Sequence, residues 1–137
     1  MATISFSDSV RKYLASDVFA TIETMRLMKG TVPTDFADLT STSSRTDDIL
    51  IEFPVINDTS VGTGYKSYSN TYYTALQSGT ATWLWGYDSS GITLVWQFVG
   101  TVGTAGTDLI IGDTAIIAGA KYRLVDIVFE FPQNYTY

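Results

Sequence analysis

Alternation of hydrophobic and polar residues along the chain predicts β-strands more often than helices. The segment 49–55, ILIEFPV, has this two-residue period. One side of the expected strand carries Ile49, Ile51 and Phe53, and the other carries Leu50 and Glu52. Proline cannot donate a ladder hydrogen bond, so Pro54 limits the strand to a sheet edge or marks its end.

The C-terminal half has the most regular pattern. Segments 80–87 and 92–100 flank Asp88–Gly91, DSSG, which predicts a hairpin with a loop of about four residues. Residues 101–107 are expected to form a glycine-rich turn, followed by short strands at 109–111 and 115–117. The segment 121–132 predicts a last strand that ends at Pro132. We expect one face of it to hold Val125, Ile127, Phe129 and Phe131.

One helix is predicted near the N-terminus, within Ser7–Ile22. Its hydrophobic residues recur every four positions, and Ser7 or Asp8 can cap its start. They are Val10, Leu14, Val18 and Ile22, with Tyr13 alongside. Threonines and β-branched residues after Ala20 place the helix end near Asp17–Phe19, and a strand is then expected through to Gly30. Residues 30–48 read as a loop. Residues 57–74 read either as a long excursion or as a short irregular strand with loops.

These elements predict an all-β protein of about six to eight strands with one short N-terminal α-helix. We expect an antiparallel, jelly-roll-like β-sandwich in a single domain over residues 1–137. Residues 1–20 would form an N-terminal arm plus the helix. No second helix alternates with the strands, which disfavours a βαβ fold.

Composition narrows the function. The 137 residues include no cysteine and no histidine, and the formal net charge is -6. Basic residues are scattered rather than clustered, so we expect no nucleic-acid partner. We also expect no membrane span and no export signal, because no long apolar run occurs. No spacing typical of a metal or cofactor site is present, so none is expected.

Catalysis finds little support in the sequence. Without histidine or cysteine the common pairs of nucleophile and base are absent. The glutamates Glu23, Glu52 and Glu130 all fall on expected strands, outside any local motif. The glycine runs 62–64 and 100–106 lack the G-K-[ST] ending of a phosphate loop. The chain is therefore expected not to be an enzyme.

Two groups of aromatic residues are candidate binding surfaces. Trp83, Trp85 and Tyr87 share one face of a strand, and Trp96 could join them across the hairpin. Packing in a core or an interface is favoured for this group, and an exposed platform for sugar rings is the alternative. Tyrosine offers a large contact area, so the second group is a candidate protein-contact surface. It comprises Tyr65, Tyr68, Tyr72 and Tyr73.

The segment Ser78–Gly119 resembles a family of small virion structural proteins of tailed phages. The resemblance rests on G-T-A-T-W, the D-S-S-G turn, G-T-V-G-T-x-G-x-D-L and T-x-I-x-A-G before the last strand. MRLMKGTVPTD at 25–35 and the opening MATISFSDSV look similar to that family as well. Residues 57–74 match no such pattern.

The resemblance implies a non-enzymatic component of the virion, assembled in the host cytoplasm. Our first hypothesis is a capsid decoration or cement protein that binds the major capsid protein as a homo-oligomer such as a trimer. Ile4 and Phe6 in the N-terminal arm are candidate contact residues. The alternatives are a neck, tail or fibre protein, and a module that binds a host glycan through Trp83, Trp85 and Tyr87.

Overall fold

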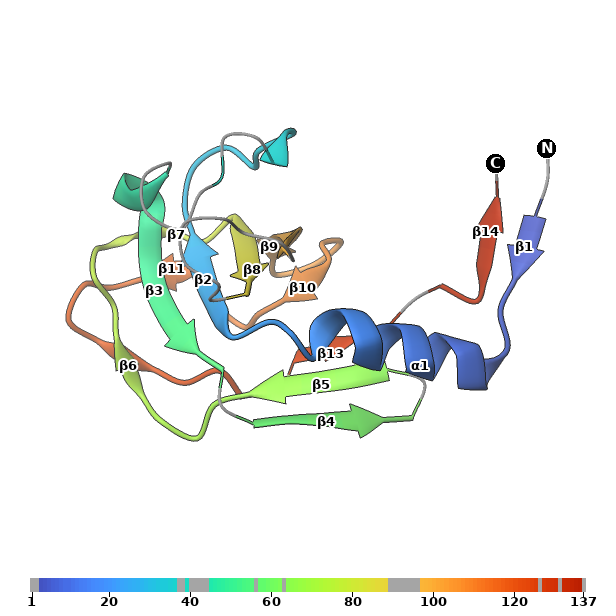
Figure 1. Cartoon of the computed structure of the whole chain (residues 1–137). Coiled ribbons are helices and arrows are strands. Elements are labelled where there is room, and N and C mark those ends of the chain that lie inside the picture. The colour runs from blue at the N-terminus through green and yellow to red at the C-terminus, as the bar shows by residue number, and fades with distance from the viewer. Residues whose placement is uncertain are drawn as a thin grey trace.

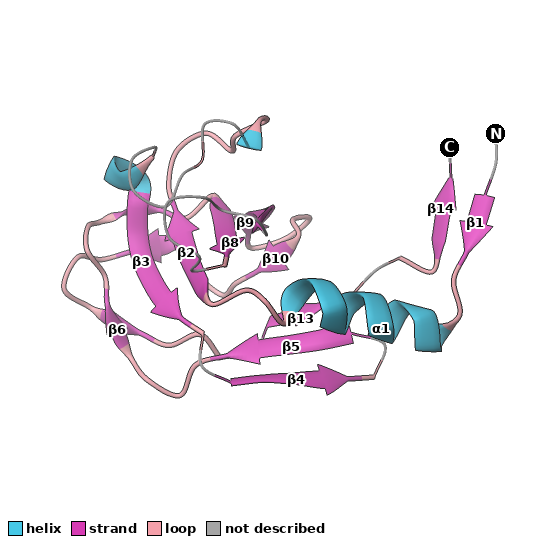
Figure 2. Cartoon of the chain, viewed as in Figure 1, coloured by secondary structure: helices cyan, strands magenta, loops and turns pink. Residues whose placement is uncertain are grey.

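The computed structural model of the chain describes residues 3–36, 39, 45–55, 57–62, 64–88, 97–125, 127–130 and 132–136. Strands account for 43% of the structure and helix for 15%, which confirms an all-β protein with one short α-helix. Figure 2 shows this balance, with many short strands and the helix α1 lying to one side of them. The finer jelly-roll topology stays a prediction.

The largest sheet has five strands in the order β10-β9-β8-β2-β3. Their bounds are Leu109–Ile110 for β10, Gln97–Gly103 for β9, Trp83–Tyr87 for β8, Thr24–Met28 for β2 and Ile49–Pro54 for β3. Neighbours are antiparallel except β10 and β9, which run parallel. The expected hairpin is therefore present as β8 and β9, while its turn and Trp96 lie outside the described residues.

Smaller sheets complete the body of the molecule (Figure 1). A three-stranded sheet has the order β13-β5-β4, with bounds Ile127–Phe129, Gly64–Tyr68 and Asn57–Val61. Two short pairs join β11 (Ala115–Ile116) to β7 (Gly79–Thr80), and β12 (Lys121–Tyr122) to β6 (Tyr73–Thr74). The tyrosine-rich region thus forms a strand pair and a third short strand rather than one long excursion.

Helix α1 spans Asp8–Phe19, close to its predicted bounds. Ser7 is the N-cap, and its Oγ accepts a 3.3 Å hydrogen bond from the amide of Val10. The helix contacts β5 and β4. Phe19 at its end stacks on Phe129 of β13, with ring centroids 4.2 Å apart. The predicted hydrophobic stripe is only partly buried, because Val10 is exposed at 42%.

Hydrophobic residues cover both faces of the five-stranded sheet. Met25 and Leu27 of β2 belong to the larger core, together with Ile127 of β13 and Leu84 of β8. Met28, one residue further along β2, belongs to the second cluster. That cluster consists of Met28, Leu39, Ile49, Trp83, Trp85 and Tyr87. A sheet buried on both faces accounts for the near-continuous hydrophobic run in β2.

One irregularity changes the predicted facing of β3. Leu27 pairs with Ile51, but the next residue, Met28, pairs with Ile49, so Leu50 is an extra residue in the ladder. Ile49 therefore lies in the second cluster, whereas Ile51 and Leu50 lie in the larger core. The predicted shared face of Ile49 and Ile51 is wrong because strict alternation does not hold across a bulge.

The C-terminal strand prediction is also partly wrong. The segment 121–132 is divided into β12 and β13, and Val125 between them is 59% exposed rather than facing the core. Phe131 lies outside the described residues. β9 continues to Gly103 into the expected glycine turn, and a further strand, β14 (Asn134–Thr136), follows Pro132.

The two ends of the chain pair with each other. β1 (Thr3–Ser5) and β14 form an antiparallel two-stranded sheet, which is extended by a hydrogen bond from the Phe6 amide to the Gln133 carbonyl. We call residues 3–6 and 133–136 together the terminal ribbon. Figure 1 shows this ribbon standing off the body, beyond the first turn of α1.

Candidate functional site

The aromatic residues of β8 form one buried row. Trp83 and Trp85 are 0% exposed, and Tyr87 is 5% exposed. Ring centroids lie 6.5 Å apart for Trp83 and Trp85, and 4.9 Å apart for Trp85 and Tyr87. Flat stacking on a sugar needs an exposed ring face, so this burial favours the packing interpretation over the glycan platform.

Both indole N–H groups are satisfied inside the protein. Trp83 Nε1 donates to the Lys29 carbonyl at 3.0 Å, and Trp85 Nε1 donates to Gln97 Oε1 at 3.1 Å. Buried indoles with internal partners are typical of structural tryptophans. Arg45 covers the outer side of this row, with its guanidinium carbon 5.1 Å from the Trp83 ring centroid.

An arginine missed by the sequence analysis lies at the centre of this cluster. The guanidinium carbon of Arg26 is 5.3 Å from the Trp85 centroid and 5.1 Å from the Tyr87 centroid. Its Nε donates a 2.7 Å hydrogen bond to Glu52 Oε2. Its Nη1 is buried and has no hydrogen-bond partner among the described residues. A lone arginine within the hydrophobic run TMRLM is the sequence feature that could have indicated a buried cation.

The phenol of Tyr87 responds to the same surroundings. Burial raises the pKa of Tyr87 above its ordinary value of 10.0. Arg26 and a hydrogen bond with Thr24 lower that pKa, while Glu52 raises it. The phenol is therefore neutral over the physiological range, and its role is packing and hydrogen bonding.

The candidate tyrosines do not form one surface. Tyr65 is 9% exposed and belongs to the core, whereas Tyr72 is 58% exposed. Tyr68 and Tyr73 are half-buried. Each has its own neighbour: Lys66 lies over the Tyr68 ring, Arg123 lies over the Tyr72 ring, and Tyr73 contacts Phe53 edge to face. Only Tyr72 offers a large exposed ring for a protein contact.

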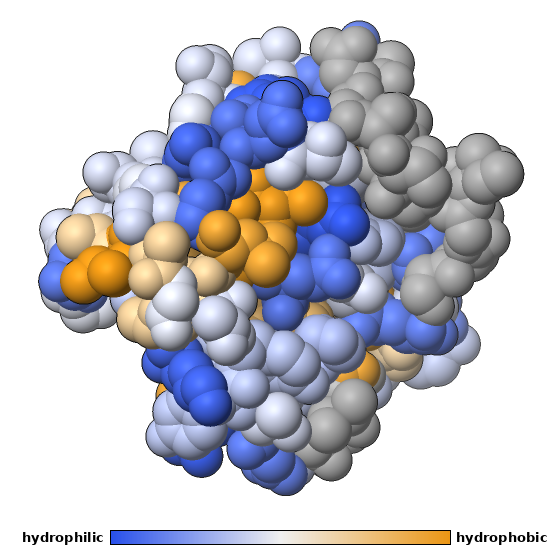
Figure 3. Space-filling view, turned by 90° about the vertical axis from the view of Figure 1, so that its left-hand side faces the viewer, coloured by the Kyte–Doolittle hydropathy of each residue, from blue (hydrophilic) through white to orange (hydrophobic). Residues whose placement is uncertain are grey.

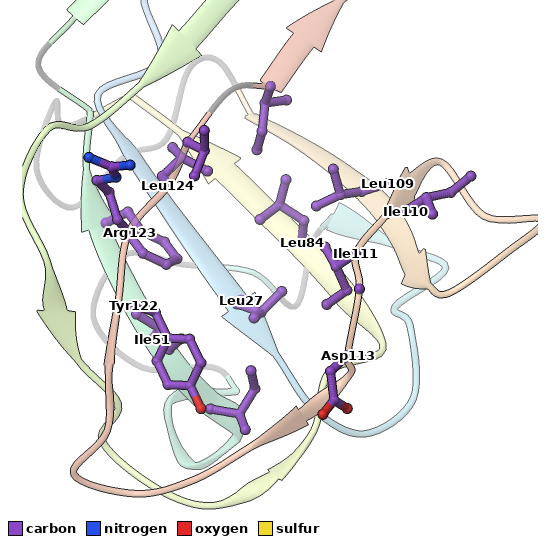
Figure 4. A pocket seen from close by; sticks show the side chains of 15 residues that line it. Leu27, Ile51, Leu84, Leu109, Ile110, Ile111, Asp113, Tyr122, Arg123 and Leu124 are labelled. Carbon is purple, nitrogen blue, oxygen red and sulfur yellow. The ribbon is translucent and has the colours of Figure 1, made fainter.

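An apolar pocket of about 340 Å³ opens between the five-stranded sheet and the chain that follows β10, from which residues 111–113, 116, 122–125 and 127 line it. Figure 4 shows Leu27, Ile51 and Leu84 projecting into it from the sheet, opposite Ile111, Tyr122 and Leu124. Asp113 and Arg123 are its charged lining residues. Figure 3 shows hydrophobic surface ringed by hydrophilic residues on one side of the molecule. The described lining residues of the pocket include no pair of groups arranged for acid–base chemistry.

The terminal ribbon contains both candidate contact residues of the N-terminal arm. Ile4 is 45% exposed, and Phe6 packs edge to face on Tyr135 with ring centroids 5.5 Å apart. On α1, Val10 and Tyr13 are exposed at 42% and 70%. The sequence grouped Val10 with the four-residue hydrophobic repeat of the helix and Tyr13 alongside it, but helical periodicity does not reveal which turns are covered by the rest of the protein.

Among the described residues, no group of three acidic, histidine or cysteine side chains is placed to hold a metal ion. Asp108 instead has a structural role, since its Oδ2 accepts hydrogen bonds from the amide and hydroxyl of Thr101. Within the residues that the structure describes, no helix is long and apolar enough to cross a membrane.

Comparison with protein-family models, with curated proteins and with solved structures found no match to this chain.

Proposed function

We propose that this chain is a non-enzymatic structural protein of a tailed-phage particle that coats the outer shell by binding the major capsid protein. The observation that carries the proposal is the exposure of large apolar side chains on the terminal ribbon and on α1. Ile4 and Tyr135 are exposed opposite each other in the ribbon, and Val10 and Tyr13 are exposed three residues apart on the helix. Exposed apolar pairs of this kind are typical of protein-contact surfaces.

Two further observations support a structural role. The aromatic cluster that was a candidate sugar platform is buried and internally bonded, so it serves stability instead. The net charge of -6 suits a solvent-facing coat, and weak contacts from many copies would add up through multivalent attachment. The resemblance of Ser78–Gly119 to phage virion proteins supports the proposal that this structural protein belongs to the virion.

The test is the copy number of the chain in purified particles, measured by quantitative mass spectrometry against the major capsid protein. About one copy per capsid subunit, or one trimer at each local three-fold axis, is the result expected for a decoration protein. A handful to a few dozen copies would move the chain to the neck, tail or fibres. Absence from purified particles would overturn the virion assignment.

A further inference from the structure

The terminal ribbon has the features of an unfinished sheet. Its register pairs Thr3 with Thr136, Ile4 with Tyr135 and Ser5 with Asn134. The ladder continues with a 2.7 Å hydrogen bond from the Phe6 amide to the Gln133 carbonyl. All six residues of the two strands are exposed. An isolated two-stranded ribbon is marginally stable in water, so it gains from further strands or a covered face.

The ribbon is amphipathic. Ile4, Phe6 and Tyr135 share one face, because residues directly opposite each other and residues two apart in a strand point the same way. Ile4 and Tyr135 remain 45% and 38% exposed on that face. The opposite face is polar. It holds Thr3, Ser5, Asn134 and Thr136.

Both outer edges of the ribbon are open to pairing. The sheet contains only β1 and β14, so neither outer edge has a partner strand among the described residues. Because the Phe6 amide points inward to Gln133, the alternation of an antiparallel ladder directs the backbone groups of Ser5 and Asn134 outward. Edge strands are normally protected by lysine, proline or a bulge, and neither of these strands has any of them.

The charge distribution favours another copy of the chain as the partner that pairs with these edges. The ribbon residues Thr3–Phe6 and Gln133–Thr136 carry no charged side chain, although the whole chain has a net charge of -6. Most surfaces of two copies therefore repel each other, while two ribbons meet without opposing charges. A neutral strand edge is also complementary to itself, whereas a partner recognised by charge would find nothing to bind there.

We propose that three copies join their terminal ribbons into a closed six-stranded ring, in which β1 of each copy pairs with β14 of the next. The rotation that relates the copies has its axis parallel to the strands, so it leaves the direction of β1 and of β14 unchanged. Each β1 therefore lies between two antiparallel β14 strands, and strand directions alternate around the whole ring. Closure removes every free edge and turns the Ile4, Phe6 and Tyr135 faces inward.

Three copies form the smallest ring that leaves space for these side chains. Barrel diameter grows with strand number, and the interior of small barrels, including five-stranded ones, is filled by side chains, so six strands can close around a packed core. Two copies would give only four strands, too few to enclose aromatic rings. The ring uses the ribbon for self-association and leaves Val10 and Tyr13 on α1 for other contacts.

The proposed ring does not rest on the virion assignment, because the purified chain alone is expected to assemble into it.

The experiment measures the mass of the full chain by light scattering after size exclusion, over a range of micromolar concentrations. The expected species is a trimer of 15.0 kDa chains. Ile4→Lys buries a charge inside the ring and should weaken the trimer by ~100-fold or more. Thr3→Lys places the same charge on the polar face of the same strand, and this variant should remain a trimer. Ser5→Pro removes an outward donor and should also give monomers.

Fluorescence of the buried tryptophans checks that each variant keeps its folded body, because the ribbon stands apart from them. A wild-type monomer, dimer or tetramer would overturn the three-copy ring. So would a trimer that survives both Ile4→Lys and Ser5→Pro with the body folded, since the interface would then lie elsewhere. Particle copy number is a separate measurement, so failure of the ring and failure of the proposed function are distinguishable.

Discussion

Arg26 and Glu52 are joined across β2 and β3 by a 2.7 Å hydrogen bond from Nε to Oε2, and only 9% of the arginine side chain is exposed. Removing the carboxylate would leave a buried cation without its charged partner. Glu52→Ala is therefore expected to lower the free energy of unfolding by about 1–3 kcal/mol, less than a fully buried pair because Glu52 is 42% exposed. Urea unfolding followed by tryptophan fluorescence measures it.

The matched control is the double variant Arg26→Met with Glu52→Leu. It replaces the ion pair by apolar side chains and should be markedly more stable than Glu52→Ala alone. If Glu52→Ala leaves the free energy of unfolding unchanged, solvent must reach Arg26, and the ion pair contributes little to the stability of the second cluster.

The raised pKa of Tyr87 predicts that the free energy of unfolding falls in alkaline solution. Its pKa is raised in the folded state, mainly by burial, so the unfolded chain releases the phenol proton at lower pH than the folded chain does. Below pH 10 the phenol is protonated in both states and has no effect on the pH dependence. As the pH rises above its ordinary pKa of 10.0, unfolding is favoured and stability falls.

The measurement is the unfolding free energy from pH 8 to 11 for the wild type and for Tyr87→Phe. The variant should show a shallower alkaline loss, at the expense of the hydrogen bond with Thr24. Tyr72→Phe, at an exposed tyrosine, is the control and should follow the wild type. Identical slopes for all three proteins would contradict the assigned role of Tyr87.

Gly86 is required by the ring of Phe98. The two residues are opposite each other in β8 and β9, and a Cβ on Gly86 would overlap that ring. Phe98 also contacts Phe19 and Phe129, with centroids 5.6 Å and 4.9 Å away, so it cannot move freely. Gly86→Ala is expected to destabilise the protein by about 1–3 kcal/mol.

A double-mutant cycle isolates this effect. Phe98→Leu removes the planar ring, so adding Gly86→Ala to it should cost less than in the wild type. Thermal unfolding of the four proteins gives the coupling energy. Additive effects would mean that the glycine serves the backbone of β8 rather than the ring.

The sequence predicted the strand-rich class, the helix and the β8–β9 pairing, because these depend on local periodicity and turn residues. It also favoured buried tryptophans. It missed Leu50 as an extra residue in β3, since a bulge is set by pairing with β2 and leaves no mark on the alternation itself. Arg26 was overlooked because its partner Glu52 is 26 residues away.

Tertiary placement accounts for the remaining differences. The tyrosines between 65 and 73 are close in sequence, yet Tyr65 in β5 points inward, while Tyr72 lies in the loop before β6 and is exposed. β14 was not predicted because the three residues Asn134–Thr136 carry no strong strand pattern and depend on β1 for pairing. The jelly-roll topology, the single-domain assignment and the protein-contact role of the four tyrosines and of Ile4 and Phe6 remain predictions.

Substitution of Trp83 distinguishes a structural role of the aromatic row from a sugar-binding role. It is fully buried and donates to the Lys29 carbonyl, so Trp83→Ala should cost about 3–5 kcal/mol of unfolding free energy. The wild type should show no retention on host polysaccharide columns. Retention of the wild type that is lost in a still-folded Trp83→Ala protein would restore the glycan interpretation.

The proposed docking surface predicts different outcomes for two exposed tyrosines. Tyr13 in the middle of α1 is 70% exposed, and Tyr72 just before β6 is 58% exposed. A charge at the centre of an apolar contact is costly to desolvate, so Tyr13→Glu should weaken co-sedimentation with undecorated capsids by ~10-fold or more. Tyr72→Glu adds the same charge elsewhere and should bind like the wild type. The opposite order of effects would transfer the docking surface to the region of Tyr72 and Arg123, and equal binding by both variants would exclude either tyrosine from the capsid contact.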